Sequence, residues 1–173
     1  MASNTGVGII GIGNLLASDD GIGIRAVREV SARLTDSRVR VVESERGGMD
    51  LLEHLAGLAT AVIVDAALTG SRAPGEVTVF SMHSPFAPEA CPSLHTIDLP
   101  GLLAFGEVMG MPLPHTVRVV TVEAQDIETF RESCTPAVEA SLPEVVERIL
   151  GEIRRAMPDV HLIPGRRETA VVR

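Results

Sequence analysis

Acidic and imidazole side chains in this chain follow stretches with strand-like patterns, which is where open α/β sheets place their sites. Two aspartates, Asp19 and Asp20, come after the β-branched run Val7–Ile12 and a glycine-containing turn. A third, Asp65, lies near the end of the most apolar run, and His95 lies in an irregular stretch further along. Two carboxylates and an imidazole converging on one crevice would offer three ligands and open positions to a borderline divalent cation.

Each of these residues also has a structural interpretation. Asp19 and Asp20 could cap the helix that follows them and interact favourably with its dipole. Asp65 could accept backbone N–H bonds at a strand end, and a lone loop histidine such as His95 usually faces solvent. Asp65 is the hardest to explain by structure alone, because burying a carboxylate within the apolar run 61–67 is costly unless it is paired or coordinates a cation.

The hydrophobic pattern alternates between strand and helix periods, which is typical of an α/β domain. The predicted strands cover residues 7–12, 39–42, 61–67, 76–81 and 117–122. The predicted helices cover residues 21–34, 49–58, 102–109 and 136–157. Residues 82–94 follow neither period and are predicted to form a long loop. Within the last helix we expect a break or restart at Pro143, because proline has no N–H to donate to the preceding turn.

These elements predict a three-layer α/β/α sandwich around a mixed, mostly parallel, twisted sheet of five strands. Strands 7–12 and 61–67 are expected in its middle. Strand 76–81 follows without an intervening helix, so it is expected to run antiparallel, because a parallel neighbour needs a crossover connection. Residues 1–163 are assigned to a single domain, and residues 164–173, which show no periodicity, to a flexible tail.

Composition excludes several classes of protein. The 173 residues are 45% hydrophobic, enough for one domain with a substantial core. A net charge of −8 and only 2% aromatic residues argue against a nucleic-acid partner. No apolar run approaches the roughly 20 residues of a membrane helix, and no secretory signal is visible, so we expect a cytoplasmic protein without membrane contact. Cys91 and Cys134 are interpreted as incidental thiols rather than nucleophiles.

A dinucleotide site after the first strand is also disfavoured. Gly11 and Gly13 match the start of the dinucleotide fingerprint, but its third glycine would fall at Leu16. Asp19 and Asp20 would in addition repel a pyrophosphate at the helix N-terminus. The same acidic loops argue against a relative of the nucleoside phosphorylases, whose phosphate site would need basic or glycine-rich loops.

A series of short motifs occurs in a characteristic order between about residues 7 and 150. They are Gly11-x-Gly13-Asn14-x-Leu16-x-x-Asp19-Asp20-Gly21-x-Gly23, Gly48-Met49-Asp50-Leu51-Leu52, Val62-Ile63-Val64-Asp65-Ala66 followed by Pro74-Gly75, Ser93-Leu94-His95, and Thr135-Pro136-Ala137-Val138-Glu139. Together they resemble the hydrogenase maturation endopeptidases, which process the large subunit of nickel-iron hydrogenases. Any one motif is weakly specific, but the ordered set is specific.

The resemblance implies a mixed five-stranded sheet and a metal site built from three loops. Carried over by position, its ligands are Asp20, Asp65 and His95, which we assign as both metal-binding and catalytic residues. It further implies that the metal is nickel, delivered inside the hydrogenase large-subunit precursor rather than bound permanently. The enzyme would then remove a short C-terminal peptide from that precursor, and it is expected to act as a monomer.

Three more residues, Asn14, Asp19 and Glu43, are assigned to substrate binding. Asp19 is equally a candidate proton carrier in metal-assisted hydrolysis or a helix cap. Family members typically carry an Asp-Gly-Gly or Asp-Gly-x-Thr turn after the second strand. Here residues 43–46 keep an acidic position without the glycines that would admit a substrate backbone. The alternative function is a non-catalytic chaperone or binding module for an immature metalloprotein.

Overall fold

The computed structural model describes residues 5–45, 47–85 and 99–163. Its helices and strands alternate along most of the chain, as the hydrophobic periods predict. In chain order they are β1 (Val7–Ile12), the short 3₁₀ helix η1 (Ser18–Gly21), α1 (Ile22–Ser31), β2 (Val39–Ser44), α2 (Met49–Leu55), β3 (Thr60–Ala67), β4 (Val77–His83), α3 (Leu99–Val108), β5 (Thr116–Glu123) and α4 (Pro136–Ala156). The predicted tail, 164–173, lies outside the described residues.

The strands form one sheet in the order β2-β1-β3-β5-β4. Pairing is parallel throughout except between β4 and β5, which are antiparallel. The predicted mixed sheet and the antiparallel fourth strand are therefore confirmed. β3 lies at the centre and is buried from Ala61 to Ala67, as expected of a parallel strand covered on both faces.

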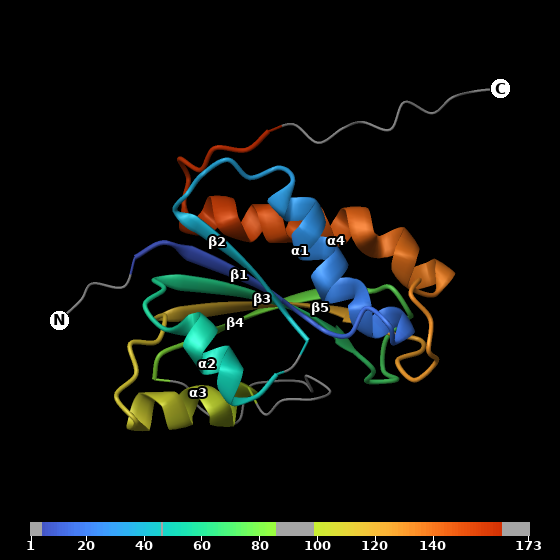
Figure 1. Ribbon diagram of the computed structural model, residues 1–173, viewed down its shortest axis with the longest axis horizontal. Coiled ribbons are helices and arrows are strands. Elements are labelled where there is room, and N and C mark those ends of the chain that lie inside the picture. The colour runs from blue at the N-terminus through green and yellow to red at the C-terminus, as the bar shows by residue number, and fades with distance from the viewer. Residues whose placement is uncertain (1–4, 46, 86–98, 164–173) are drawn as a thin grey trace.

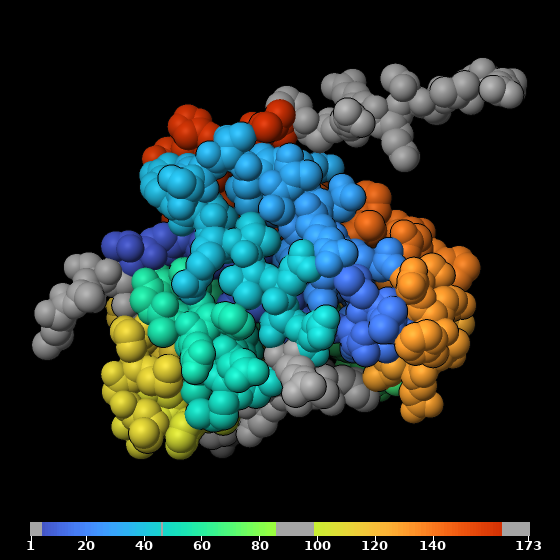
Figure 2. All heavy atoms as spheres, viewed as in Figure 1, coloured from blue at the N-terminus to red at the C-terminus, as the bar shows by residue number. Residues whose placement is uncertain are grey.

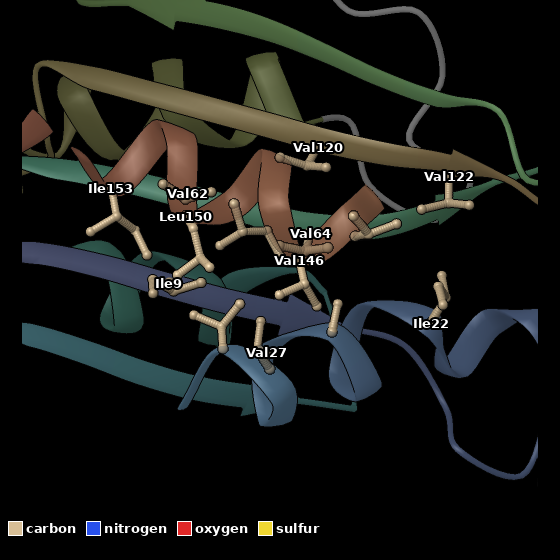
Figure 3. Close-up of a cluster of buried hydrophobic side chains, with 14 of the residues drawn as sticks. Ile9, Ile22, Val27, Val62, Val64, Val120, Val122, Val146, Leu150 and Ile153 are labelled. Atoms are coloured by element: carbon tan, nitrogen blue, oxygen red, sulfur yellow. The ribbon is translucent and has the colours of Figure 1, made fainter. Parts of the chain in front are cut away.

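Two hydrophobic clusters, one on each face of the sheet, form the core. Figure 1 shows α1 and α4 on one face and α2 and α3 on the other. Because side chains alternate along a strand, neighbouring residues of β1 enter different clusters: Ile9 packs with α1 and α4, and Ile10 with α2 and α3. Figure 3 shows the first cluster, which includes Val62 and Val120 of the sheet and Leu150 of α4.

Helix α1 begins directly against the backbone of the sheet. A Cβ atom at Gly23 would lie 2.3 Å from the carbonyl oxygen of Ile12 and 2.5 Å from that of Val64. Only glycine allows this approach, so the first turn of α1 is fixed against the ends of β1 and β3. The segment that joins β1 to α1 is thereby anchored at the edge where parallel strands place functional groups.

Some predicted boundaries were wrong. Helix α4 continues through Pro143, where a break was expected. Its buried face on both sides of the proline, including Val138 and Val145, stays packed on the sheet and compensates for the missing hydrogen bond. β4 runs on to His83, past the predicted start of the loop, because its pairing with β5 extends as far as Thr116. No helix among the described residues is long and apolar enough to cross a bilayer.

Candidate active site

A cavity of about 300 Å³ opens beside the carboxyl ends of β1 and β3. Because these strands are parallel neighbours, the loops that follow them meet at one edge of the sheet. Asp20, from η1, and Asp65, from β3, both line the cavity, so the structure brings together these two predicted ligands. Among the described residues, the lining consists of Ile12, Gly13, Asp20, Glu45, Gly47, Gly48 and Asp65.

Asp65 is the most enclosed group of the site. Its side chain is 2% exposed, and among the described residues Oδ2 has no hydrogen-bond partner. The pKa of Asp65 is raised to about 8, chiefly by burial and then by the nearby charge of Asp20, against an opposing hydrogen bond from the backbone of Ala66. A carboxyl whose pKa lies near neutrality, in a cleft, is suited to gain and lose a proton during a reaction.

Asp20 is half-buried and fixed from one side. The backbone N–H of Asn14 donates to its Oδ2 at 2.7 Å. The side chain of Asn14 in turn accepts the N–H of Leu16 at 2.9 Å, which closes a tight turn. The N-cap residue of α1 is Gly21, so Asp20 does not occupy the capping position. Asn14 is exposed at the turn, and its predicted contact with substrate stays a prediction.

Asp19 is placed differently from Asp20. Its side chain is fully buried and does not line the cavity. Its oxygens accept four hydrogen bonds at 2.6–3.0 Å, from the N–H and Oγ1 of Thr135 and from the N–H groups of Gln125 and Asp126. The assignment of Asp19 to substrate binding is therefore corrected, because its carboxylate is enclosed by protein donors.

Glu43 forms an ion pair on the outside of the fold. Its carboxylate accepts two hydrogen bonds from the guanidinium of Arg28, at 2.9 and 2.7 Å, and these lower its pKa. It does not line the cavity. The wall of the cavity is formed instead by Glu45, Gly47 and Gly48, which sequence analysis did not select.

The glycines expected to be missing from this wall are therefore present. Gly48 has a φ of +98°, in the region that favours glycine, and a Cβ there would meet no atom within 4 Å. An acidic residue followed, after one intervening position, by two glycines begins at Glu45, two residues after the expected acidic position Glu43. The signal that could have found it is the spacing Glu45-x-Gly47-Gly48 itself.

His95 and Cys91 lie outside the described residues, so the third predicted ligand stays a prediction. Within 5–45, 47–85 and 99–163, no group of three His, Cys, Asp or Glu side chains is arranged to hold a metal ion. Cys134 is described and buried, and burial raises the pKa of its thiol to about 11. The thiol form therefore dominates at neutral pH, in agreement with an incidental rather than nucleophilic role.

Comparison with known proteins decides the family. A family model described as "Hydrogenase maturation protease" matches residues 24–152. The chain belongs to this family. The Hydrogenase 2 maturation protease of Escherichia coli is 26% identical to it over 155 residues, which are 86% of this chain and 90% of the relative. The resemblance found in the motifs is thereby confirmed, and the protein is a peptidase of hydrogenase maturation.

Solved structures agree with this assignment. The hydrogenase maturating endopeptidase HybD from E. coli superposes with a TM-score of 0.76 and is 26% identical, covering 92% of this chain and 97% of HybD. The [NiFe] hydrogenase maturation protease HybD from Thermococcus kodakarensis superposes with a TM-score of 0.65 at 25% identity, covering 86% of this chain and 99% of that one. The α/β architecture of this maturation protease is therefore that of solved members of the family.

Proposed function

We propose that this maturation protease removes a short C-terminal peptide from the nickel-loaded precursor of a nickel-iron hydrogenase large subunit. The substrate's nickel would be the recognition element, bound by Asp20, Asp65 and His95. One observation carries the proposal: the cavity holds a buried carboxylate oxygen, Asp65 Oδ2, with no partner among the described residues and a second carboxylate beside it.

Such a pair of carboxylates favours a cation that arrives from outside. Without a cation, burial and the charge of Asp20 keep Asp65 protonated near neutral pH. A divalent cation entering the cavity would displace that proton and satisfy both carboxylates at once. Carboxylate and imidazole ligands suit a borderline metal ion, and nickel is one. A cation carried in by the substrate explains why the site can be built from ligands that repel each other in its absence.

The remaining walls fit a polypeptide substrate. Gly47 and Gly48 line the cavity, and Gly48 leaves open space where a Cβ would lie, so an extended chain can approach the backbone there. The substrate's nickel would bring the scissile peptide group to the cavity and polarise it. Asp65, deprotonated by the arriving cation, would coordinate it through Oδ2, while Asp20 is kept in place by the N–H of Asn14.

Intact-mass spectrometry of the precursor tests the proposal. Nickel-loaded and nickel-free precursor are incubated with the native protease, with Asp65→Asn and with Asp20→Asn. Asp50→Asn, an exposed aspartate of α2, is the matched control for loss of one charge. We expect loss of a single C-terminal peptide only from the nickel-loaded precursor, and only with the native protein and the Asp50→Asn variant.

Two results would count against the proposal. Equal cleavage of nickel-free precursor would reject nickel as the recognition element. Full cleavage by the Asp65→Asn variant would reject the assigned site. An unchanged precursor mass together with a stable complex would instead favour non-catalytic binding of the immature metalloprotein.

A further inference from the structure

The segment between β5 and α4, residues 125–135, closes around the short helix that carries Asp20. We refer to residues 125–135 as the clasp. Figure 1 shows it looping from the end of the sheet to the start of α4, beside η1, and Figure 2 shows the two surfaces in contact. Backbone hydrogen bonds join them at three points: Ser18 N–H to the Arg131 carbonyl, Asp19 N–H to the Asp126 carbonyl, and Arg131 N–H to the Leu16 carbonyl, all at 2.9–3.0 Å.

Side chains tighten the same contact. The four hydrogen bonds of Asp19 all come from the clasp and tie η1 to both of its ends, Gln125 and Thr135. Arg131 adds a hydrogen bond from its guanidinium to Ser18 Oγ at 2.7 Å. Asp19 is thus a fully buried carboxylate whose partners lie more than 100 residues away in sequence, with separations of 106, 107 and 116.

The backbone at this point is held in an unfavourable conformation. Ser18 has a φ of +52°, and it is the single non-glycine residue with a positive φ in the described part of the chain. A residue with a Cβ relaxes from this backbone conformation to one with a negative φ unless its surroundings hold it. Ser18 is held through its N–H and its Oγ, both by the clasp. Ser18, the strained residue, comes two positions before Asp20. Its backbone conformation therefore helps to set the direction in which the Asp20 side chain projects from the backbone.

We propose that Asp19 is the positioning residue of the active site, which acts through the clasp to hold Asp20 facing Asp65. The inference rests on the proposed function for the role of Asp20, and on the contacts above for the geometry. Two neighbouring carboxylates repel each other, and a loop free to move would carry the half-buried Asp20 toward solvent. Asp19 prevents this movement without lining the cavity, because the four hydrogen bonds that it accepts from the clasp hold η1 in place.

A purely structural role for Asp19 leads to a different expectation. If Asp19 served only global stability, its loss would lower the unfolding temperature and leave the site of the folded protein unchanged. A positioning residue changes the site of the protein that remains folded. The backbone N–H of Asn14 reports this directly, because it donates to Asp20 Oδ2 at 2.7 Å and no hydrogen bond joins Asn14 to Asp19 in the described structure.

The test compares three variants with the native protein. Asp19→Asn replaces an acceptor by a donor against the N–H of Thr135. Thr135→Val removes only the Oγ1 hydrogen bond, since the Thr135 side chain caps no N–H of α4. Glu128→Gln is the control, an exposed glutamate of the same clasp. The Asn14 amide is followed by ¹H–¹⁵N NMR and hydrogen exchange, and processing of nickel-loaded precursor is measured as kcat and KM.

For Asp19→Asn we expect an upfield shift of the Asn14 amide proton and a loss of exchange protection there on the order of tenfold, with the amides of β3 unchanged. The same variant is expected to lose about 10²-fold in kcat/KM, because the misplaced Asp20 serves both to bind the substrate's nickel and to complete the site. Thr135→Val is expected to show smaller effects in the same direction, and Glu128→Gln none.

A native Asn14 amide and native kcat/KM in folded Asp19→Asn would overturn the proposal. If Asp19→Asn does not fold, Thr135→Val decides, and an unchanged Asn14 amide in that variant is the overturning result. If the native protein does not process the precursor at all, the proposed function fails. The amide measurement still answers whether Asp19 positions Asp20, so the two failures are distinguishable.

Discussion

Replacing Asp65 by asparagine is expected to stabilise the metal-free fold while it abolishes processing. In the unfolded chain the pKa of this carboxyl is near 3.8, whereas burial and the charge of Asp20 raise it to about 8 in the folded protein. Below about pH 4 both states carry the proton and Asp65 contributes no pH dependence. Between about pH 4 and 8 the unfolded chain has released the proton and the folded protein has not, so stability falls as pH rises.

The expected magnitude follows from that difference in pKa. Stability falls by about 1.4 kcal/mol for each pH unit between the two pKa values, so over the roughly three units from about pH 4 to pH 7 the folded protein loses roughly 4 kcal/mol. The side chain is 2% exposed, so solvent screening reduces this little. Asparagine does not titrate, and the advantage of Asp65→Asn is therefore expected to grow from near zero at about pH 4 to roughly 4 kcal/mol at pH 7. In a domain of this size that corresponds to a shift on the order of 10 °C in Tm.

Urea unfolding in the presence of a chelator, at a series of pH values between about 4.5 and 8, measures this difference. The native protein and Asp65→Asn are compared with Asp50→Asn, which removes an exposed carboxylate from α2. The informative quantity is how the difference changes with pH, because a constant offset also contains the changed hydrogen bonding of the amide. Parallel curves for native and Asp65→Asn would show that Asp65 ionises normally in the folded protein and would refute the reasoning.

Further predictions concern the site and its support. Asp20→Asn is expected to lower the pKa of Asp65 while leaving it above the usual range, because repulsion is removed and burial remains; ¹³C NMR titration of the Asp65 carboxyl carbon checks this. Gly23→Ala is expected to destabilise the fold by about 2–4 kcal/mol, since its Cβ would overlap carbonyl oxygens of the sheet. Gly151→Ala, in the open interior of α4, is expected to stabilise it by about 0.5–1 kcal/mol, and paired urea unfolding curves compare the two. Cys134→Ala is expected to retain full processing, because a buried thiol whose pKa is about 11 supplies little thiolate; the precursor mass assay measures it.

Local pattern was enough to predict the sheet and half of the site. The β-branched runs that became β1 and β3 are distinctive, and two parallel neighbours necessarily end at the same edge. The meeting of Asp20 with Asp65 follows from that arrangement, since Asp20 comes soon after β1 and Asp65 lies near the end of β3. Both results follow from the hydrophobic periodicity and from the order of the strands, which can be inferred from a single sequence.

Other features depended on contacts between distant parts of the chain. Asp19 was open to capping, substrate-binding and proton-transfer interpretations, because its partner Thr135 lies 116 residues away. Pro143 predicted a helix break because the packing that keeps α4 continuous comes from the sheet beneath it. Glu45 and the glycines after it were overlooked because a shift of two residues in a loop leaves no periodic signal.

The long sequence separation between η1 and the clasp has a consequence for the order of events during synthesis. Asp20 is made early, but the last donor that fixes its neighbour is Thr135, 116 residues after Asp19. β5, the second partner of the central strand β3, also begins only at Thr116. At about 5–20 residues per second, ribosomes need roughly 6–23 s to cover that interval. A nascent chain therefore carries the carboxylates of the site before it can hold them in place, and its peptidase centre is assembled only when the start of α4 has emerged.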